Sequence, residues 1–140
     1  LKQMLATKLA DSARVQVLIE SADALLETDV ELVGRILLQL VSNSLKFSQA
    51  PQQVIVELEL IDDMLSMLVH DKGIGIPAEA MENIFDLFYR ANNVGVRRGL
   101  GVGLHIVAQL TERLGGTIEF ESDVEKGSTF CLRLPCATNV

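Results

Sequence analysis

Polar residues in one apolar segment have the types and spacing of a ligand-binding row. Gln39, Asn43 and Lys46 are spaced i, i+4 and i+7, so a helix places their side chains on one face, and Arg35 extends the row. An Asn side-chain oxygen is a suitable ligand for Mg²⁺, and a lysine is a point-charge partner for phosphate. A solvated polar helix face is the alternative interpretation of the same row.

A second group of residues follows a strongly apolar segment and has the sequence Asp71-Lys72-Gly73-Ile74-Gly75-Ile76-Pro77. A carboxylate at the end of a buried strand needs a hydrogen-bond donor. The amino group of an adenine base would provide one, and Gly73 and Gly75 would let a flat base approach the backbone. An ordinary loop, in which glycine supplies unusual backbone angles, is the alternative.

A third segment is rich in glycine and leads directly into a helical pattern, with the sequence Gly99-Leu100-Gly101-Val102-Gly103-Leu104. Free N–H groups at the N-terminus of a helix favour phosphate through hydrogen bonds and the helix dipole. The segment is not a Rossmann loop, because no strand directly precedes it and its glycine spacing differs. It is not a P-loop, because no Gly-Lys-Ser/Thr follows.

Aromatic and basic residues lie between these two glycine segments, in Ile84-Phe85-Asp86-Leu87-Phe88-Tyr89-Arg90. Phe85 and Phe88 are either core residues or the anchors of a lid whose Arg90 reaches a phosphate. Arg97 and Arg98 precede the glycine run and add positive potential there. Near the C-terminus, Gly127-Ser128-Thr129 by itself indicates only a hairpin.

The remaining reactive side chains are interpreted as structural. Neither His70 nor His105 has an obvious nucleophile or a paired carboxylate at a telling spacing. Cys131 and Cys136 lie close together, but they match no zinc spacing. We therefore interpret them as buried or idle thiols of a reducing compartment.

Length, composition and charge bound the class of protein. The 140 residues, 49% hydrophobic and 22% charged, are enough for one globular domain with a real core. A net charge of −7 without a concentrated basic patch argues against binding to duplex nucleic acid or to an anionic membrane surface. No apolar run is long enough to cross a bilayer, and no signal peptide is visible. The chain begins with Leu inside a helical pattern, so we expect a single domain, 1–140, cut from a longer protein.

Periodicity and turn residues predict the elements that must position these groups. The expected helices cover residues 1–13, from Asp29 as N-cap to about Phe47, from Ala78 after Pro77 to about Ile84, and from about Gly103 to Leu114 before Gly115-Gly116. The expected strands are Val15–Ile19, Val54–Ile61, Leu65–Val69, Thr117–Glu121 and Thr129–Leu134, with Asp62-Asp63 as a tight hairpin connection. This order predicts an α+β two-layer sandwich, a mixed sheet of about five strands covered on one face by helices.

The order and spacing of the segments resemble those of the catalytic, ATP-binding domain of sensor histidine kinases. That domain belongs to a superfamily shared with gyrase-type, chaperone and mismatch-repair ATPases. The resemblance covers about residues 14–135. Its boxes are the asparagine box Arg35–Ser48, the phenylalanine box Ile84–Arg90, and the glycine boxes Asp71–Pro77, Gly99–Leu104 and Gly127–Thr129.

The resemblance implies a role for each matching residue. Asn43 would be the Mg²⁺ ligand, Lys46 a phosphate contact, and Phe47 a flank of the nucleotide. Asp71 would read adenine, in a base pocket shaped by Gly73 and Gly75, with Thr129 nearby. The remaining residues implied to bind ATP are Tyr89, the phosphate-contacting Arg90, and the backbone donors Gly99, Leu100, Gly101, Val102, Gly103 and Leu104, with residues 91–98 as the ATP lid.

The activity that the resemblance implies is transfer of the γ-phosphoryl group of Mg-ATP to a histidine, in two-component signal transduction. The acceptor would lie on a separate dimerisation domain of the same protein, and a response regulator would act downstream. ATP and Mg²⁺ are the implied cofactors. We expect a cytoplasmic domain that is monomeric when isolated, lacks the acceptor histidine, and contacts neither nucleic acid nor membrane.

Gln39 departs from the family pattern, which often has a second Asn at this position. Because Gln keeps the amide, the expected effect is modest. In the related ATPases the position is typically a Glu that activates water, and Gln39 cannot act as that general base. Those ATPases also often have an acidic residue in place of Lys46. Both differences favour phosphotransfer over two alternatives that remain open, an ATPase-type switch of the same fold and a degenerate kinase domain that acts as a protein-binding module.

Overall fold

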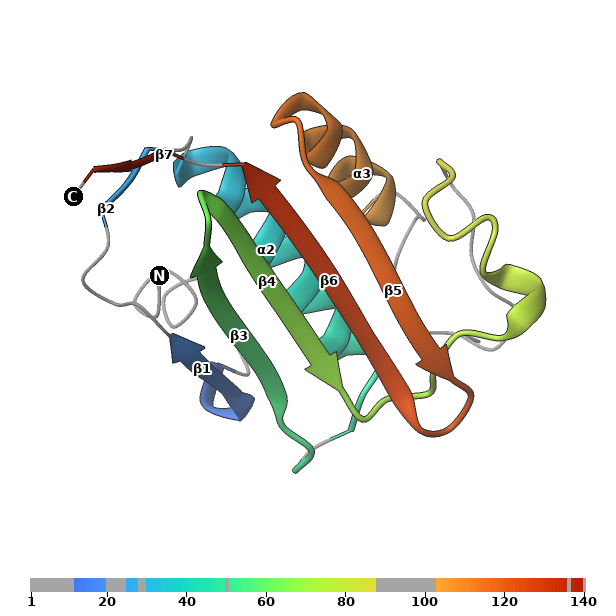
Figure 1. Ribbon diagram of the computed structural model, residues 1–140. Helices are drawn as coiled ribbons and strands as arrows, with labels where there is room; N and C mark the ends of the chain where they lie inside the picture. Colours follow the sequence, from blue (N-terminus) through green and yellow to red (C-terminus); the bar gives the residue numbers. More distant parts are fainter. Residues whose placement is uncertain are drawn as a thin grey trace.

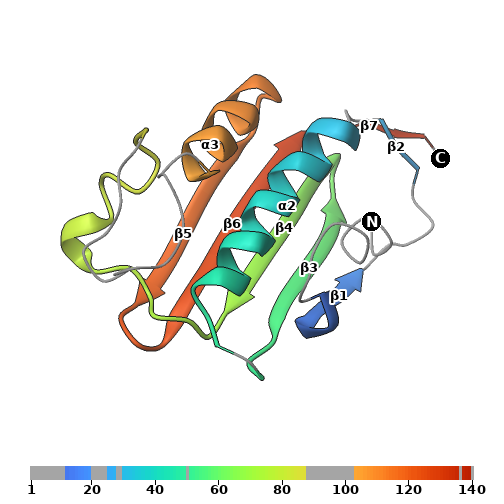
Figure 2. The ribbon, with the colours of Figure 1, turned by 180° about the vertical axis from the view of Figure 1, so that it is seen from behind.

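The computed structural model describes residues 12–19, 25–27, 30–49, 51–87, 103–135 and 137–139. Five strands form one mixed sheet, and two helices cover one of its faces (Figures 1 and 2). The strand order is β1-β3-β4-β6-β5. The elements are β1 (Val15–Ile19), α2 (Val30–Lys46), β3 (Val54–Ile61), β4 (Met64–Asp71), α3 (Gly103–Arg113), β5 (Thr117–Asp123) and β6 (Gly127–Pro135). The α+β sandwich expected from the sequence is thereby confirmed.

Turn residues set the central hairpin of the sheet. Asp62 and Asp63 both have positive φ, 50° and 59°, and they connect β3 to β4 with Ile61 opposite Met64. Two consecutive residues with positive φ are typical of the tight turns that match the twist of a hairpin. The predicted hairpin is confirmed. β1 runs parallel to β3, with Val15 opposite Val54, and the other strand pairs of this sheet are antiparallel.

Gly115 and Gly116 follow the C-terminal end of α3, as the sequence predicts. Gly115 has φ 74°, its N–H donates to the carbonyl of Glu112 at 2.9 Å, and the N–H of Gly116 donates to Thr111 at 3.0 Å. These bonds satisfy two carbonyls at the end of α3 and turn the chain into β5.

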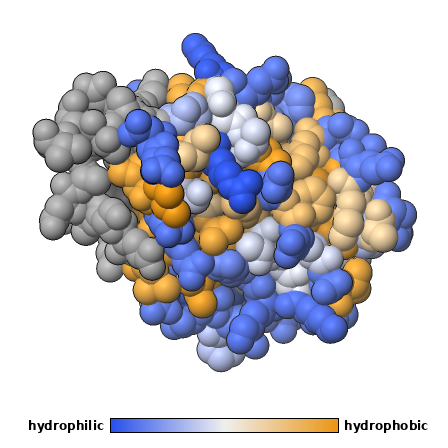
Figure 3. Space-filling view, in the orientation of Figure 1, coloured by the Kyte–Doolittle hydropathy of each residue, from blue (hydrophilic) through white to orange (hydrophobic). Residues whose placement is uncertain are grey.

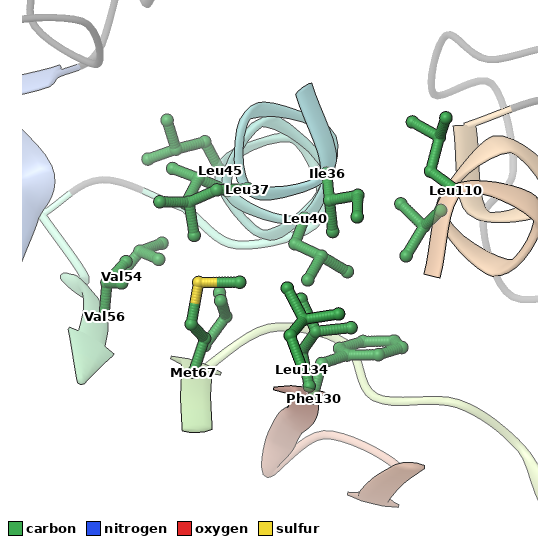
Figure 4. Packing of buried hydrophobic residues seen from close by; sticks show 14 of the residues in the cluster. Ile36, Leu37, Leu40, Leu45, Val54, Val56, Met67, Leu110, Phe130 and Leu134 are labelled. Carbon is green, nitrogen blue, oxygen red and sulfur yellow. The ribbon is translucent and has the colours of Figure 1, made fainter. Parts of the chain in front are cut away.

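The hydrophobic core lies between α2 and the sheet (Figure 4). The stripe of Ile36, Leu37, Leu40 and Val41 is at most 1% exposed, as expected for residues at i, i+3 and i+4 positions. It packs against the inward residues of the strands, and α3 adds Val107 and Leu110. The opposite face of the sheet, toward the viewer in Figure 3, mixes hydrophilic and hydrophobic side chains.

The segment after Pro77 differs from its prediction. A 3-10 helix covers only Ala78–Ala80, in place of a helix that reaches Ile84. The N–H groups of Ala80, Met81 and Asn83 donate to carbonyls three residues earlier, at 2.9, 3.3 and 3.0 Å. Such i to i+3 bonds form tight turns, which rarely continue as a long helix.

Two short strands were not predicted. β2 (Leu25–Glu27) pairs antiparallel with β7 (Ala137–Asn139) in a separate two-stranded sheet. Most of the helix expected over residues 1–13, and the whole of the expected lid 91–98, lie outside the described residues, although Ser12–Arg14 forms a 3-10 helix. No helix of the described ranges combines the length and apolarity that a membrane span requires.

Candidate functional site

Asp71, the last residue of β4, is held in place by several donors. Its Oδ1 accepts the backbone N–H of Gly73 at 2.9 Å and that of Ser128 at 3.2 Å. The side chain of Ser44, which is 2% exposed, also bonds to this carboxylate. Burial raises the pKa of the Asp71 carboxyl above its ordinary value, while these bonds and the nearby His70 act in the opposite direction. The result is a half-buried acceptor in a fixed orientation.

Three glycines let the backbone close around this carboxylate. A Cβ on Gly73 would lie 2.4 Å from the carbonyl oxygen of Phe47, and one on Gly127 would lie 2.1 Å from that of Asp71. Gly75 has φ 74°, and its Cβ would lie 2.1 Å from the carbonyl oxygen of Asp123. Real Cβ atoms do not tolerate such distances. The first and third glycine boxes therefore pack directly against each other and against the end of α2.

The polar row of α2 ends close to the segment that follows Asp71. Asn43 and Phe47 are half-buried, whereas Lys46 is exposed with its Nζ 5.9 Å from the centre of the Phe47 ring. The carbonyl of Phe47 accepts the N–H of Ile74 at 3.1 Å, so the end of α2 is fastened to the segment that follows Asp71. Among the described residues, no group of three or more His, Cys, Asp and Glu side chains is arranged to hold a metal.

The beginning of α3 lies against this row. The Oε1 of Gln39 is 2.8 Å from the position that a Cβ on Gly103 would occupy, and Gln39 precedes Asn43 by one helical turn. Leu104 is half-buried and packs on the core. The structure thus brings Gly103 to the predicted row. The other residues predicted for this part of the site, Tyr89, Arg90, Gly99, Leu100, Gly101 and Val102, lie outside the described residues.

Phe85 belongs to an aromatic cluster. Its ring meets Phe120 and Phe130 edge-on, with centroids 5.8 and 6.4 Å apart, which agrees with the core interpretation. The carbonyl of Phe85 accepts a bond of 3.0 Å from Nδ1 of His105, in the first turn of α3. His105 thus has the structural role that the sequence predicts.

Thr129 is placed differently from its prediction. Its Oγ1 lies 3.0 Å from Nδ1 of His70, whose Nε2 lies 3.0 Å from Oε2 of Glu57. Register pairs His70 with Thr129 and Asp71 with Ser128, and neighbours along a strand point to opposite faces. The Thr129 hydroxyl therefore lies on the open face of the sheet, away from the Asp71 carboxylate.

Ser128 and Ser122 are the contacts that sequence reasoning missed. Ser128 supplies an N–H to Asp71, and its hydroxyl lies 2.7 Å from that of Ser122. Ser122 Oγ also accepts the N–H of Ile76 at 2.8 Å, which fastens the first glycine box to the hairpin of β5 and β6. The sequence does contain one signal, because side chains along β6 alternate between the two faces of the sheet. This alternation identifies Ser128 as the neighbour of Asp71 only when the register of β6 with β4 is known.

Comparison with known proteins assigns a family to this arrangement. Residues 28–138 match the model for the family described as histidine kinase-, DNA gyrase B- and HSP90-like ATPases. The autoinducer 2 sensor kinase/phosphatase LuxQ of Vibrio vulnificus is 39% identical over 120 residues, covering 81% of this chain and 14% of that protein. The chain therefore spans only a small part of the length of this curated relative.

Solved structures share the fold. The mycobacterial sensor histidine kinase MprB superposes with a TM-score of 0.81 at 24% identity, over 98% of this chain and 96% of that one. Full-length ShkA in complex with AMPPNP gives a TM-score of 0.80 at 24% identity, over 99% of this chain and 30% of that one. At such identities the likeness concerns the fold.

Proposed function

The chain belongs to the family of histidine kinase-, DNA gyrase B- and HSP90-like ATPases, and we propose that it binds Mg-ATP and donates the γ-phosphoryl group to a histidine of another domain. The acceptor would lie on a helical dimerisation domain of the same protein. The observation that supports this proposal most directly is the Asp71 carboxylate, with Oδ1 held by two backbone N–H groups inside a backbone cradle that excludes side chains.

Recognition of adenine would depend on Asp71. Gly73 and Ser128 orient the carboxylate, which can accept a bond from the exocyclic amino group of the base. Guanine has a carbonyl oxygen at that position, and two acceptors would repel each other. Gly73 and Gly75 let the backbone close tightly around this carboxylate, and the half-buried Phe47 would flank the base.

The triphosphate would extend from this pocket along α2 toward α3. Asn43 would contribute an oxygen to Mg²⁺, and phosphate oxygens and water would supply the other ligands that this small ion requires. Mg²⁺ bound there would neutralise charge that develops on the transferred group. Lys46 would contact a phosphate, and Gly103 and Leu104 would present N–H groups from the first turn of α3. Tyr89, Arg90 and Gly99 to Val102 complete the proposed set.

In the proposed reaction, a neutral imidazole nitrogen of the acceptor attacks the γ-phosphorus while the bond to the β,γ-bridging oxygen breaks and ADP leaves. This domain would contribute positioning and charge neutralisation. Gln39 has an amide where a water-activating carboxylate would be needed for hydrolysis, which favours a protein acceptor. We propose that a response regulator then receives the phosphoryl group, and that the domain acts in the cytoplasm, where ATP is supplied.

Calorimetric titration of Mg-ATP into the wild type and into Asp71→Asn tests the nucleotide site. We expect the variant to bind about 10- to 100-fold more weakly, because an ionised acceptor is lost. Ser66→Ala, on the opposite face of β4, is the matched control and should bind like the wild type. Equal affinities of wild type and Asp71→Asn, or no binding by either protein, would reject the assignment.

A second experiment tests the reaction. The domain is mixed with the helical acceptor domain of its own protein and with ATP labelled at the γ-position. Acid-labile label on the acceptor is the expected result. Steady release of phosphate without labelling would favour the ATPase-type switch. Binding of ATP without either outcome would favour a protein-binding module.

A further inference from the structure

A series of hydrogen bonds connects the beginning of β1 to the end of α2. The 3-10 helix Ser12–Arg14 and the C-terminal end of α2 lie at the same end of the sheet (Figures 1 and 2). Arg14 donates from Nη2 to Ser48 Oγ and from Nε to the carbonyl of Gln52, both at 2.9 Å. One guanidinium thus holds the chain on both sides of the turn that follows α2.

The contacts continue inward to Asp71. Ser48, 8% exposed, donates from Oγ to the carbonyl of Ser44 at 2.6 Å. Ser44 carries the hydroxyl that bonds to the Asp71 carboxylate. Arg14 and Ser48 therefore hold the backbone at the last turn of α2, and the side chain of Ser44 in that turn acts on the Asp71 carboxylate. Phe47 lies between Ser44 and Ser48 in the chain.

The C-terminal end of α2 needs hydrogen-bond donors from outside the helix. The last four carbonyls of α2 lack partners within the helix, and the Ser44 carbonyl, one of these four, is satisfied by Ser48. A cation near this end also interacts favourably with the helix dipole. Without Arg14, the buried Ser48 loses a donor, and the turn that carries Ser44 is held less firmly.

We infer that Arg14 is a positioning residue for the adenine end of the nucleotide site, acting through Ser48 and Ser44 on Asp71. Arg14 immediately precedes β1. The inference rests on the proposed function, because it concerns how firmly Asp71 is held for the base.

The test compares ATP with inosine triphosphate, which lacks the amino group that Asp71 is proposed to read. Calorimetry gives both dissociation constants for the wild type, Arg14→Ala, Ser48→Ala and the double variant. We expect Arg14→Ala to bind ATP about fivefold more weakly and inosine triphosphate nearly unchanged, the fivefold being the effect of one hydrogen bond of about 1 kcal/mol. Ser48→Ala should give a similar pattern, and the double variant should lose little more than either single one.

Arg133→Ala is the matched control, because Arg133 is exposed, pairs only loosely with Glu119 at 3.8 Å, and lies opposite Ser66 on β4. Affinities for ATP that are equal in Arg14→Ala and Arg133→Ala would overturn the inference. An equal loss for both nucleotides would do so as well, since it would indicate general destabilisation. A wild type that binds neither nucleotide, or both alike, would instead overturn the proposed reading of adenine.

Discussion

The amide oxygen of Gln39 lies 2.8 Å from the position that a Cβ on Gly103 would occupy. This contact joins the middle of α2 to the first residue of α3, one helical turn before the Asn43 that we propose as the Mg²⁺ ligand. A glycine at this position lets α3 begin directly beside the amide. In the proposed site, the Asn43 amide oxygen would face Mg²⁺ and the free N–H groups at the start of α3 would face phosphate oxygens of the same nucleotide.

Gly103→Ala should therefore displace the Gln39 amide while the domain remains folded. The atom that the new methyl group meets is the end of a flexible side chain, and alanine favours helix by up to about 1 kcal/mol over glycine. We expect little change in the free energy of unfolding and a several-fold weaker affinity for Mg-ATP. A double-mutant cycle with Gln39→Ala, read by calorimetry, should give a coupling of about 0.5 kcal/mol or more. Strict additivity would mean that the contact is irrelevant to binding.

The half-buried Asp71 carboxyl should make the free energy of unfolding depend on pH in a defined direction. Its pKa in the folded state is raised above the ordinary value of 3.8, so between the two pKa values the folded state binds more protons than the unfolded chain. The free energy of unfolding then decreases as pH rises through this interval. Below this interval the carboxyl is protonated in both states, so its titration does not affect the free energy of unfolding. Above it the carboxyl is ionised in both states, and the folded state carries the full cost of burying the charge.

Asp71→Asn removes this titration while keeping an acceptor for the N–H groups of Gly73 and Ser128. Urea unfolding of both proteins, from below pH 3.8 to neutral pH, isolates the contribution of Asp71 as their difference. We expect the wild type to lose stability relative to the variant as pH rises. A relative gain would show that the hydrogen bonds to the ionised form outweigh burial.

The glycines with positive φ should differ in their tolerance of alanine. At Gly115 the added Cβ has space, with Pro135 Cγ at 3.7 Å, so Gly115→Ala should cost only the backbone conformation, about 1–2 kcal/mol. At Gly75 and Gly127 the Cβ would also meet backbone oxygens at 2.1 Å, which cannot move independently. Both variants should lose more stability in urea unfolding than Gly115→Ala. The same loss at all three sites would contradict the close backbone packing.

Turn chemistry explains which parts of the fold could be predicted from the sequence. Asp62-Asp63 and Gly115-Gly116 determine the hairpin and the end of α3 by local backbone preferences, and the apolar stripe of α2 has a clear helical period. The strands Leu25–Glu27 and Ala137–Asn139 have three residues each and pair across most of the chain. Neither periodicity nor turn residues identify so short a long-range pair. Pro77 indicated where a helix begins and contained no information on its length.

Residue types in the sequence identify candidate site residues where the type itself carries the chemistry. They do not identify which of two neighbouring strand residues faces the site, because that depends on the register between strands. Gly73 packs against Asp71 and the end of α2, and Gly103 lies beside Gln39. Both glycines and the Asp71 acceptor were predicted, because an acceptor or a missing side chain can be recognised in the sequence. The choice between Ser128 and Thr129 depends on the pairing of β6 with β4. A shift of one residue moves every side chain to the other face, and pairing is a property of the folded sheet.

Thr129→Val tests this register directly. The hydroxyl of Thr129 bonds to His70 on the open face, so its loss should reduce the free energy of unfolding by about 1 kcal/mol. Because Ser128, and not Thr129, donates its backbone N–H to Asp71, the affinity for Mg-ATP should stay within about twofold of the wild type. His70→Ala removes the same bond from the other side and serves as a second variant for the stability measurement. A tenfold or larger loss of ATP affinity in Thr129→Val, with the domain still folded, would return Thr129 to the nucleotide site and contradict the placement of its hydroxyl on the open face.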